Sequence, residues 1–254
     1  MADRIPSGTR DVLPDETREV RVITDALRGV FEAEGYGEVS TPALEYESVL
    51  ARAEMTDAQP AYRLFDETGA VLALRSDMTV PIARVAATRY ATTEPPLRFS
   101  YFAHCYRGVR PQRGQSRELL QAGIELIGAP APQGTAEALT VLCRALDATG
   151  LADYRLGLGD ASLFPALMDG LGVFDEVRPG ILETLARRDF VELEQRLLAA
   201  GLADDASELL LSVPQRRGGP EVLAGAPGPT ADAVAGLRQV HELLEPAVDR
   251  KSVV

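Results

Sequence analysis

The sequence predicts an α+β fold, in which a mostly antiparallel sheet flanked by helices is joined to a helical region. Two long segments, Leu97–Arg107 and Arg117–Ile127, read as strands, and the second alternates between a polar and an apolar side. From Asp160 onward, by contrast, the apolar spacing is helical almost throughout. Strands and helices segregated in this way are typical of α+β proteins. We therefore expect a sheet domain over residues 1–159 and a mostly helical insertion over residues 160–254.

The first expected element is a helix that follows a proline-containing opening loop. Asp15 is suited to cap it, and Gly35 is suited to end it in the left-handed conformation. A short strand over residues 38–41 should then stop before Pro42. The apolar face of the helix repeats at three-to-four spacing and consists of Val20, Ile23, Leu27, Val30 and Phe31.

A hairpin and a second helix are predicted next. The strands Tyr62–Asp66 and Val71–Leu74 flank a turn at residues 67–70 that contains glycine. A helix from about Met78 to Arg89 accommodates Pro81 in its first turn, where no backbone donor is needed.

The second half of the chain begins at a proline-rich break, Pro130–Pro132. A helix to about Thr149 and a strand at Tyr154–Gly159 are expected after it. Helical spacing then extends from Asp160 to about Ala247, interrupted by glycine and proline.

Composition and charge restrict the function. Asp and Glu outnumber Lys and Arg, 38 to 26, for a net charge of −12. Nucleic-acid binding draws on clustered basic residues, so this balance argues mildly against it. A run of about 18 apolar residues, the length that a membrane span needs, is not found. We expect a cytoplasmic protein that binds neither tRNA nor a membrane.

Motifs for catalysis or metal binding are weak. Cys105 and Cys143 stand alone and are expected to be reduced, buried thiols. The two histidines, His104 and His241, are far apart, and no His/Cys spacing suits a metal. Walker and dinucleotide fingerprints are absent, as is a nucleophile elbow. The sequence therefore predicts no catalytic residue, no metal and no cofactor.

The second long strand has two different faces. Gln121, Gly123 and Glu125 share one side because side chains alternate along a strand. The glycine should leave a hollow in which the amide and the carboxylate hold an ammonium group. The alternative is a solvated sheet face. The opposite side is expected to face the core and consists of Leu120, Ala122, Ile124 and Leu126.

A second polar cluster lies where a strand gives way to a helix. Asp77 and Thr79 are suited to cap this helix, and a helix amino terminus also favours a carboxylate ligand. Arg107, at the end of the first long strand, is suited to bidentate binding of phosphate or carboxylate. Capping alone, and a solvent-facing arginine, are the alternatives.

These segments resemble histidyl-tRNA synthetases and their non-catalytic relatives. The resemblance begins at residues 8–14 and 41–45, and continues in LALRSDMTVPIAR at Leu72–Arg84. YRGVRPQRGQSRELLQAGIELIG at Tyr106–Gly128 resembles motif 2 of the class II aminoacyl-tRNA synthetase fold in its histidyl form. The resemblance to motif 2 implies that Arg107 matches the arginine that contacts the ATP α-phosphate and the activated carboxylate. It also implies that the amino group of histidine is held by residues matching Asp77, Thr79, Gln121 and Glu125.

Departures from the family pattern affect the nucleotide site. Val109 stands where the family has a glutamate that reads the adenine amine, and Gln115 stands where an arginine is usual. The sequence ends at Val254, before the blocks that supply the γ-phosphate arginine and central strands. The resemblance thus implies a degraded nucleotide site and a fold whose carboxy-terminal part is missing.

Later segments resemble one branch of the family, the regulatory subunits of ATP phosphoribosyltransferase. They lie at residues 156–164, 185–189 and 219–223. This resemblance implies a homodimer within a hetero-oligomer that contains the short-form catalytic subunit. That subunit joins ATP to phosphoribosyl pyrophosphate with magnesium, and histidine inhibits it by feedback. The alternatives are a histidyl-tRNA synthetase, or a fragment of one, and a free-standing histidine-binding protein.

Overall fold

The computed structural model describes residues 5–52, 61–108, 116–151, 153–244 and 252–253 of the chain. Its contacts form two compact units. The first unit comprises Met1–Ala129 and Val141–Ala152, and the second comprises Pro130–Thr140 and Asp153–Val254. The division into domains at residues 159 and 160 stays a prediction.

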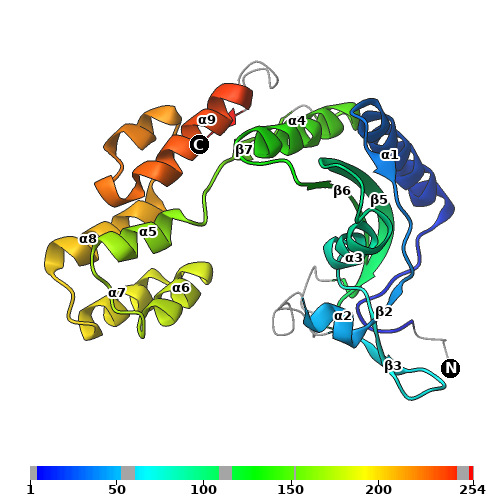
Figure 1. The fold of residues 1–254 in the computed structure, drawn as a ribbon, viewed down its shortest axis with the longest axis horizontal. Coiled ribbons are helices and arrows are strands. Elements are labelled where there is room, and N and C mark those ends of the chain that lie inside the picture. Colours follow the sequence, from blue (N-terminus) through cyan, green and yellow to red (C-terminus); the bar gives the residue numbers. More distant parts are fainter. Residues whose placement is uncertain (1–4, 53–60, 109–115, 152, 245–251, 254) are drawn as a thin grey trace. The chain divides into compact units, whose positions relative to one another are not determined.

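The first unit is built on a sheet with strand order β1-β5-β6 (Figure 1). The two long strands, β5 (Leu97–Tyr106) and β6 (Glu118–Ile127), are antiparallel, and the short β1 (Gly37–Glu38) runs parallel to β5. Their register places Ala103 opposite Gln121 and Tyr101 opposite Gly123. Both long strands are therefore confirmed, within one residue at one end.

Helices cover both faces of this sheet. On one face, α1 (Pro14–Ala33) and the second half of α4 (Gln133–Ala148) form a core with side chains of both strands. These residues are Phe31, Val141, Ala145, Phe102, Ile124 and Leu126. On the other face, α3 (Thr79–Arg89) packs on a second core of Met78, Ile82, Phe99, Tyr101, Ala103 and Cys105. Gln121, Gly123 and Glu125 on the polar face of β6 are half-buried, so that face is partly covered. Of the predicted core face, Ile124 and Leu126 pack against the first core, whereas Leu120 is 42% exposed.

The amino-terminal end of α1 differs from the prediction. The helix begins at Pro14, so Asp15 lies inside its first turn and pairs with Arg18 instead of capping. Proline at the first helical position needs no donor, which explains why the helix begins two residues earlier than a cap at Asp15 would allow. The predicted left-handed cap at Gly35 is confirmed by its φ of 83°.

A smaller antiparallel sheet has the order β2-β4-β3. The predicted hairpin is confirmed as β3 (Arg63–Phe65) and β4 (Val71–Leu74), and Asp66 accepts backbone hydrogen bonds within its turn. β2 (Leu44–Tyr46) and the following α2 (Glu47–Ala51) have no counterpart in the sequence prediction. They are too short for a periodic signal.

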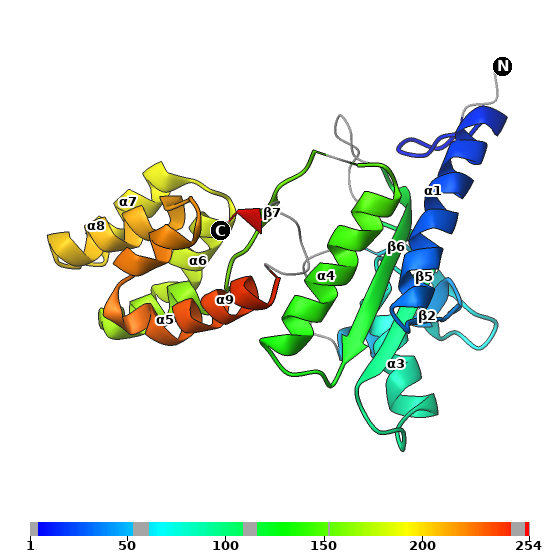
Figure 2. The same ribbon diagram turned by 90° about the horizontal axis from the view of Figure 1, so that it is seen from above.

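The second unit is mostly helical, as predicted (Figure 2). Its core of Leu167, Met168, Val173, Ile181, Leu193, Leu197 and Leu210 is buried. The strand expected at 154–159 is reduced to β7 (Leu156–Gly157), which pairs with β8 (Ser252–Val253). The α-helices are α5 (Leu163–Gly170), α6 (Arg178–Ala186), α7 (Phe190–Ala199), α8 (Asp204–Ser212) and α9 (Ala231–Leu244). The 3₁₀ turns are η1 (Val213–Gln215), η2 (Pro220–Gly225) and η3 (Gly228–Thr230).

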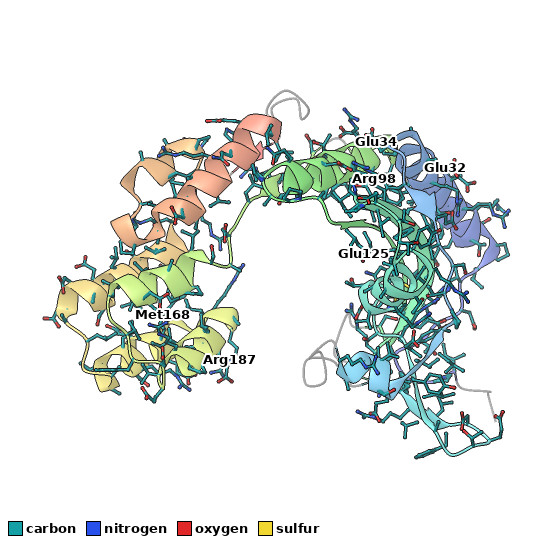
Figure 3. All side chains as sticks on the ribbon, in the orientation of Figure 1. Glu32, Glu34, Arg98, Glu125, Met168 and Arg187 are labelled. Atoms are coloured by element: carbon teal, nitrogen blue, oxygen red, sulfur yellow. The ribbon has the colours of Figure 1, made fainter. Side chains whose placement is uncertain are left out.

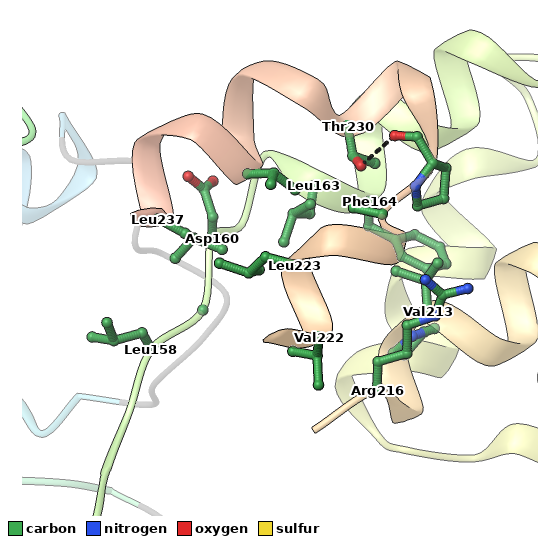
Figure 4. A pocket seen from close by; sticks show the side chains of 15 residues that line it. Leu158, Asp160, Leu163, Phe164, Val213, Arg216, Val222, Leu223, Thr230 and Leu237 are labelled. Atoms are coloured by element: carbon green, nitrogen blue, oxygen red, sulfur yellow. Dashed lines mark hydrogen bonds between the residues drawn. The ribbon is translucent and has the colours of Figure 1, made fainter. Parts of the chain in front are cut away.

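A pocket of about 300 Å³ lies within the second unit (Figure 4). Apolar side chains, chiefly leucine and valine, form most of its lining, and Asp160 and Arg216 supply charge. Thr230 beside it donates to its own turn, at the carbonyl of Pro227. The pocket contains none of the site residues predicted from the sequence.

None of the helices in the described part of the chain is long and apolar enough to cross a membrane.

Candidate functional site

The predicted polar residues of β6 and α3 meet on the face of the sheet that α3 covers. The Thr79 hydroxyl donates to Glu125 Oε1 over 3.0 Å, which joins residues 46 positions apart (Figure 3 labels Glu125). Asp77 Oδ1 accepts the backbone N–H of Thr79 over 2.9 Å and so stabilises the first turn of α3. The N-cap position is Met78, so Asp77 bonds to the first helical residue from one position before the cap, and the Thr79 side chain bonds to Glu125.

Gln121 lies on the same face and is held at both ends of its amide. Its Oε1 is 3.1 Å from the Cys105 sulfur, and its Nε2 donates to the Tyr101 hydroxyl over 3.1 Å. The predicted hollow over Gly123 is filled. A Cβ added to Gly123 would lie 2.5 Å from the Tyr101 hydroxyl oxygen, so the glycine gives space to the tyrosine ring.

The negative charges of Asp77 and Glu125 shift the pKa values of groups on this face. Burial, and then the nearby charge of Asp77, raise the pKa of Glu125, although the hydrogen bond from Thr79 opposes them. Burial, and then the charge of Glu125, raise the pKa of Tyr101 to about 12. In the described parts of the chain, neither Asp77 nor Glu125 forms a salt bridge with a basic side chain. The arrangement is therefore suited to a cationic ligand group such as an ammonium.

Arg107 is not brought into contact with these carboxylates. It directly follows β5, where its backbone N–H donates to the carbonyl of Arg117 over 2.8 Å. Its Nε is buried, and it has no hydrogen-bond partner among the described residues. Burial raises the pKa of Cys105, and the charges of Arg75 and then Arg107 oppose that shift, so Arg107 lies near Cys105. Val109 and Gln115, the residues of the degraded nucleotide site, lie outside the described residues, and their role stays a prediction.

Sequence reasoning assigned no role to Arg75, which is 8% exposed. Its Nε donates to the carbonyl of His104 over 2.8 Å, and its Nη1 donates to that of Thr41 over 2.7 Å. The guanidinium thereby joins the end of β4 to β5 and to the chain before β2. The sequence around Arg75 has no feature that distinguishes this residue from an exposed arginine at the end of a strand. Tyr101 and Cys105 were also missed, although pairing the two predicted strands places them beside Gln121.

The close approach of Tyr101 to Gly123 predicts that Gly123→Ala destabilises the protein. The added methyl group must displace the aromatic ring, and overpacking of this kind costs about 1–3 kcal/mol. Urea unfolding followed by circular dichroism measures the change. Gly29→Ala in α1 is the control, because its Cβ would meet open space and alanine favours a helix. Equal stability of the two variants would contradict the steric assignment.

Comparison with known proteins places this geometry in a family. The family profile described as Histidyl-tRNA synthetase matches residues 8–253. A protein of Desulforamulus reducens called ATP phosphoribosyltransferase regulatory subunit is 38% identical over 94% of this chain and 60% of its own length. A Symbiobacterium thermophilum protein with the same description is 40% identical over 83% of this chain and 53% of its own. The chain thus spans little more than half the length of these relatives.

Solved structures agree with the sequence comparison. A crystal structure from Bacillus halodurans, described as an ATP phosphoribosyltransferase regulatory subunit/histidyl-tRNA synthetase, superposes with a TM-score of 0.91 at 25% identity. It matches 99% of this chain, which covers 67% of that one. Histidyl-tRNA synthetase from Nostoc superposes with a TM-score of 0.79 at 17% identity, which supports the fold alone. The predicted class II synthetase-like fold is confirmed, and the chain belongs to the histidyl-tRNA synthetase family.

Proposed function

We propose that this chain is a non-catalytic regulatory subunit of ATP phosphoribosyltransferase. It activates the short-form catalytic subunit and takes part in histidine feedback control of the first step of histidine biosynthesis. The observation that carries the proposal is its similarity, at 38% and 40% identity, to relatives described as regulatory subunits. The resemblance of residues 156–164, 185–189 and 219–223 to that branch supports the same choice.

The ligand proposed for the sheet unit is free histidine. Glu125, Thr79, Gln121 and Asp77 would hold its ammonium group, since they form a polar cluster in which both carboxylates lack a basic partner among the described residues. Arg107 would take the carboxylate through its guanidinium. Binding would control the partner if histidine has a higher affinity for one assembly state than for another.

The proposed subunit acts without a cofactor of its own. Adenylation requires nucleotide and carboxylate to be positioned together, and Val109 and Gln115 replace residues that the family uses for the nucleotide. Its partners would be the short-form catalytic subunit and a second copy of this chain. A cytoplasmic location fits the two cysteines, both of which are buried and neither of which forms a disulfide within the described residues.

Histidyl-tRNA synthetase is the second candidate function. It is favoured by the family profile itself and by the double description of the Bacillus halodurans structure. The two candidates differ in one measurable property, because only a synthetase exchanges pyrophosphate with ATP in the presence of histidine.

The experiment is to add this chain to a short-form ATP phosphoribosyltransferase and to measure the rate of product formation. We expect the rate to rise with added chain and to fall again when histidine is added. Circular dichroism on the same sample establishes that the chain is folded. An unchanged rate with folded protein would contradict the regulatory role, and histidine-dependent pyrophosphate exchange would favour the synthetase.

A further inference from the structure

The pocket of the second unit lies where two hydrophobic cores meet. Phe164 and Val213 pack at the edge of the core formed by α5 to α8, and both are only half-buried. Leu223, Val234 and Leu237 are the buried centre of another core, formed by η2 and α9. All five side chains line the pocket. The two cores therefore leave about 300 Å³ between them that their own side chains do not fill.

The shape of the pocket is suited to a small molecule. Five segments of the second unit form its walls: the connector between β7 and α5, α5 itself, η1, η2 and the start of α9 (Figure 4). Walls that converge in this way form a concave site, whereas a helix of another protein needs an open groove. Its volume is at the lower end of the range for ligand pockets. We therefore expect a small ligand that is mostly apolar.

The two charged side chains of the lining differ in the bonds that they have left to make. Asp160 Oδ1 accepts the backbone N–H of Ser162 over 2.8 Å and its hydroxyl over 2.5 Å, which stabilises the turn before α5. Arg216 donates from Nη1 to the carbonyl of Gly225 over 2.5 Å. It forms no ion pair with a carboxylate among the described residues. Its charge and its other N–H donors are therefore left for a ligand.

The position of Arg216 gives the ligand a direction. The bond to Gly225 joins the residue after η1 to the end of η2 and so holds the guanidinium at the pocket. Figure 4 shows Arg216 and Asp160 on opposite sides of the apolar side chains. A guanidinium binds a carboxylate through paired N–H groups, and the charge of Asp160 disfavours the same carboxylate at the other side. The acidic end of a ligand is thus directed to Arg216.

We propose that this pocket binds a small carboxylic acid with an apolar body. The carboxylate pairs with Arg216, and the apolar chain or ring fills the space between the two cores. A neutral or cationic molecule with the same apolar body lacks the pairing and binds more weakly. The site is separate from the polar cluster of the sheet unit and does not depend on the proposed function.

Calorimetric titration at neutral pH with octanoate, 1-octanol and octylammonium tests this assignment. The three probes share one apolar chain and differ in the charge of the head group. We expect octanoate to bind roughly tenfold more tightly than either of the others, the lower end of what hydrogen bonds to a charged group contribute. Arg216→Met should remove this preference without changing the affinity for 1-octanol, and Arg216→Lys should restore part of it.

Two control variants are matched to the pocket. Arg217→Met removes the charge of the neighbouring arginine, which is exposed and does not line the pocket, so octanoate binding should not change. Ala226→Phe places a ring in the pocket and should abolish binding of both octanoate and 1-octanol. Ala224→Phe, on the exposed side of η2, is its control. Thermal unfolding of each variant establishes that the titrated protein is folded.

The outcomes that overturn the proposal are distinct. If 1-octanol or octylammonium binds as tightly as octanoate, or if Arg217→Met weakens octanoate as much as Arg216→Met, Arg216 does not bind the carboxylate. If octanoate produces neither heat nor a rise in melting temperature, the pocket is not a site for such acids. Octanoate binding that survives Ala226→Phe would place the ligand elsewhere on the chain and overturn the assignment.

Discussion

Glu125→Gln is expected to weaken L-histidine binding by roughly two orders of magnitude, as the loss of a buried charge partner does at other interfaces. The amide keeps the shape of the carboxylate and can still accept from Thr79, so the change removes charge and little else. Calorimetric titration at neutral pH measures the effect. Glu118→Gln, on the same strand but exposed, is the control and should bind as the unmodified chain does.

The same variant should be more stable than the unmodified chain when no ligand is present. Burial and Asp77 raise the pKa of Glu125 above its value in the unfolded chain, so the folded state binds this proton more tightly. The ionised carboxylate therefore destabilises the fold at neutral pH, and the penalty disappears as the pH falls below the unfolded pKa, roughly 4.3. Melting temperatures measured from pH 4 to pH 8 should converge at the acid end. A variant that binds normally, or that melts lower at neutral pH, would refute the charge assignment.

Arg75→Met is expected to lower the free energy of unfolding by about 1.5–3 kcal/mol, the net contribution of hydrogen bonds that involve a charged group. Its guanidinium donates to carbonyl oxygens of Thr41, Pro42 and His104, which would be left without this donor in the folded protein. Urea unfolding measured by circular dichroism gives the change.

Arg75→Lys should also be destabilising, because an ammonium lacks the planar fork that reaches two segments at once. Arg21→Met on the exposed side of α1 is the matched control and should change stability by less than about 0.5 kcal/mol. If Arg75→Met were as stable as this control, the guanidinium would not be needed to join the two sheets.

Most elements follow from local patterns. Helical spacing predicted α1 and α3 to within a residue or so, and alternation predicted β5 and β6 almost to their ends. Those signals are strong because each element buries one regular face over ten or more residues. Asp15 shows where such reasoning fails, since a proline one residue earlier can start the same helix.

The candidate site was predictable in part. Alternation along one strand places Gln121 and Glu125 on the same face, and the structure agrees with that placement. What alternation does not reveal is the residue opposite each of them. Gly123 predicted a hollow, yet the register with β5 brings Tyr101 over it.

By itself, then, the sequence of this protein determined the longer elements of the first unit, α1, α3, β5 and β6, and which side of β6 is polar. Only the tertiary structure decided that Thr79 reaches Glu125, that Cys105 and Tyr101 hold Gln121, and that Arg75 is buried. The reason is physical. The spacing of apolar residues indicates which side of a helix or strand is buried. Which element packs against that side, and the register of a strand pair, depend on packing between segments distant in the chain.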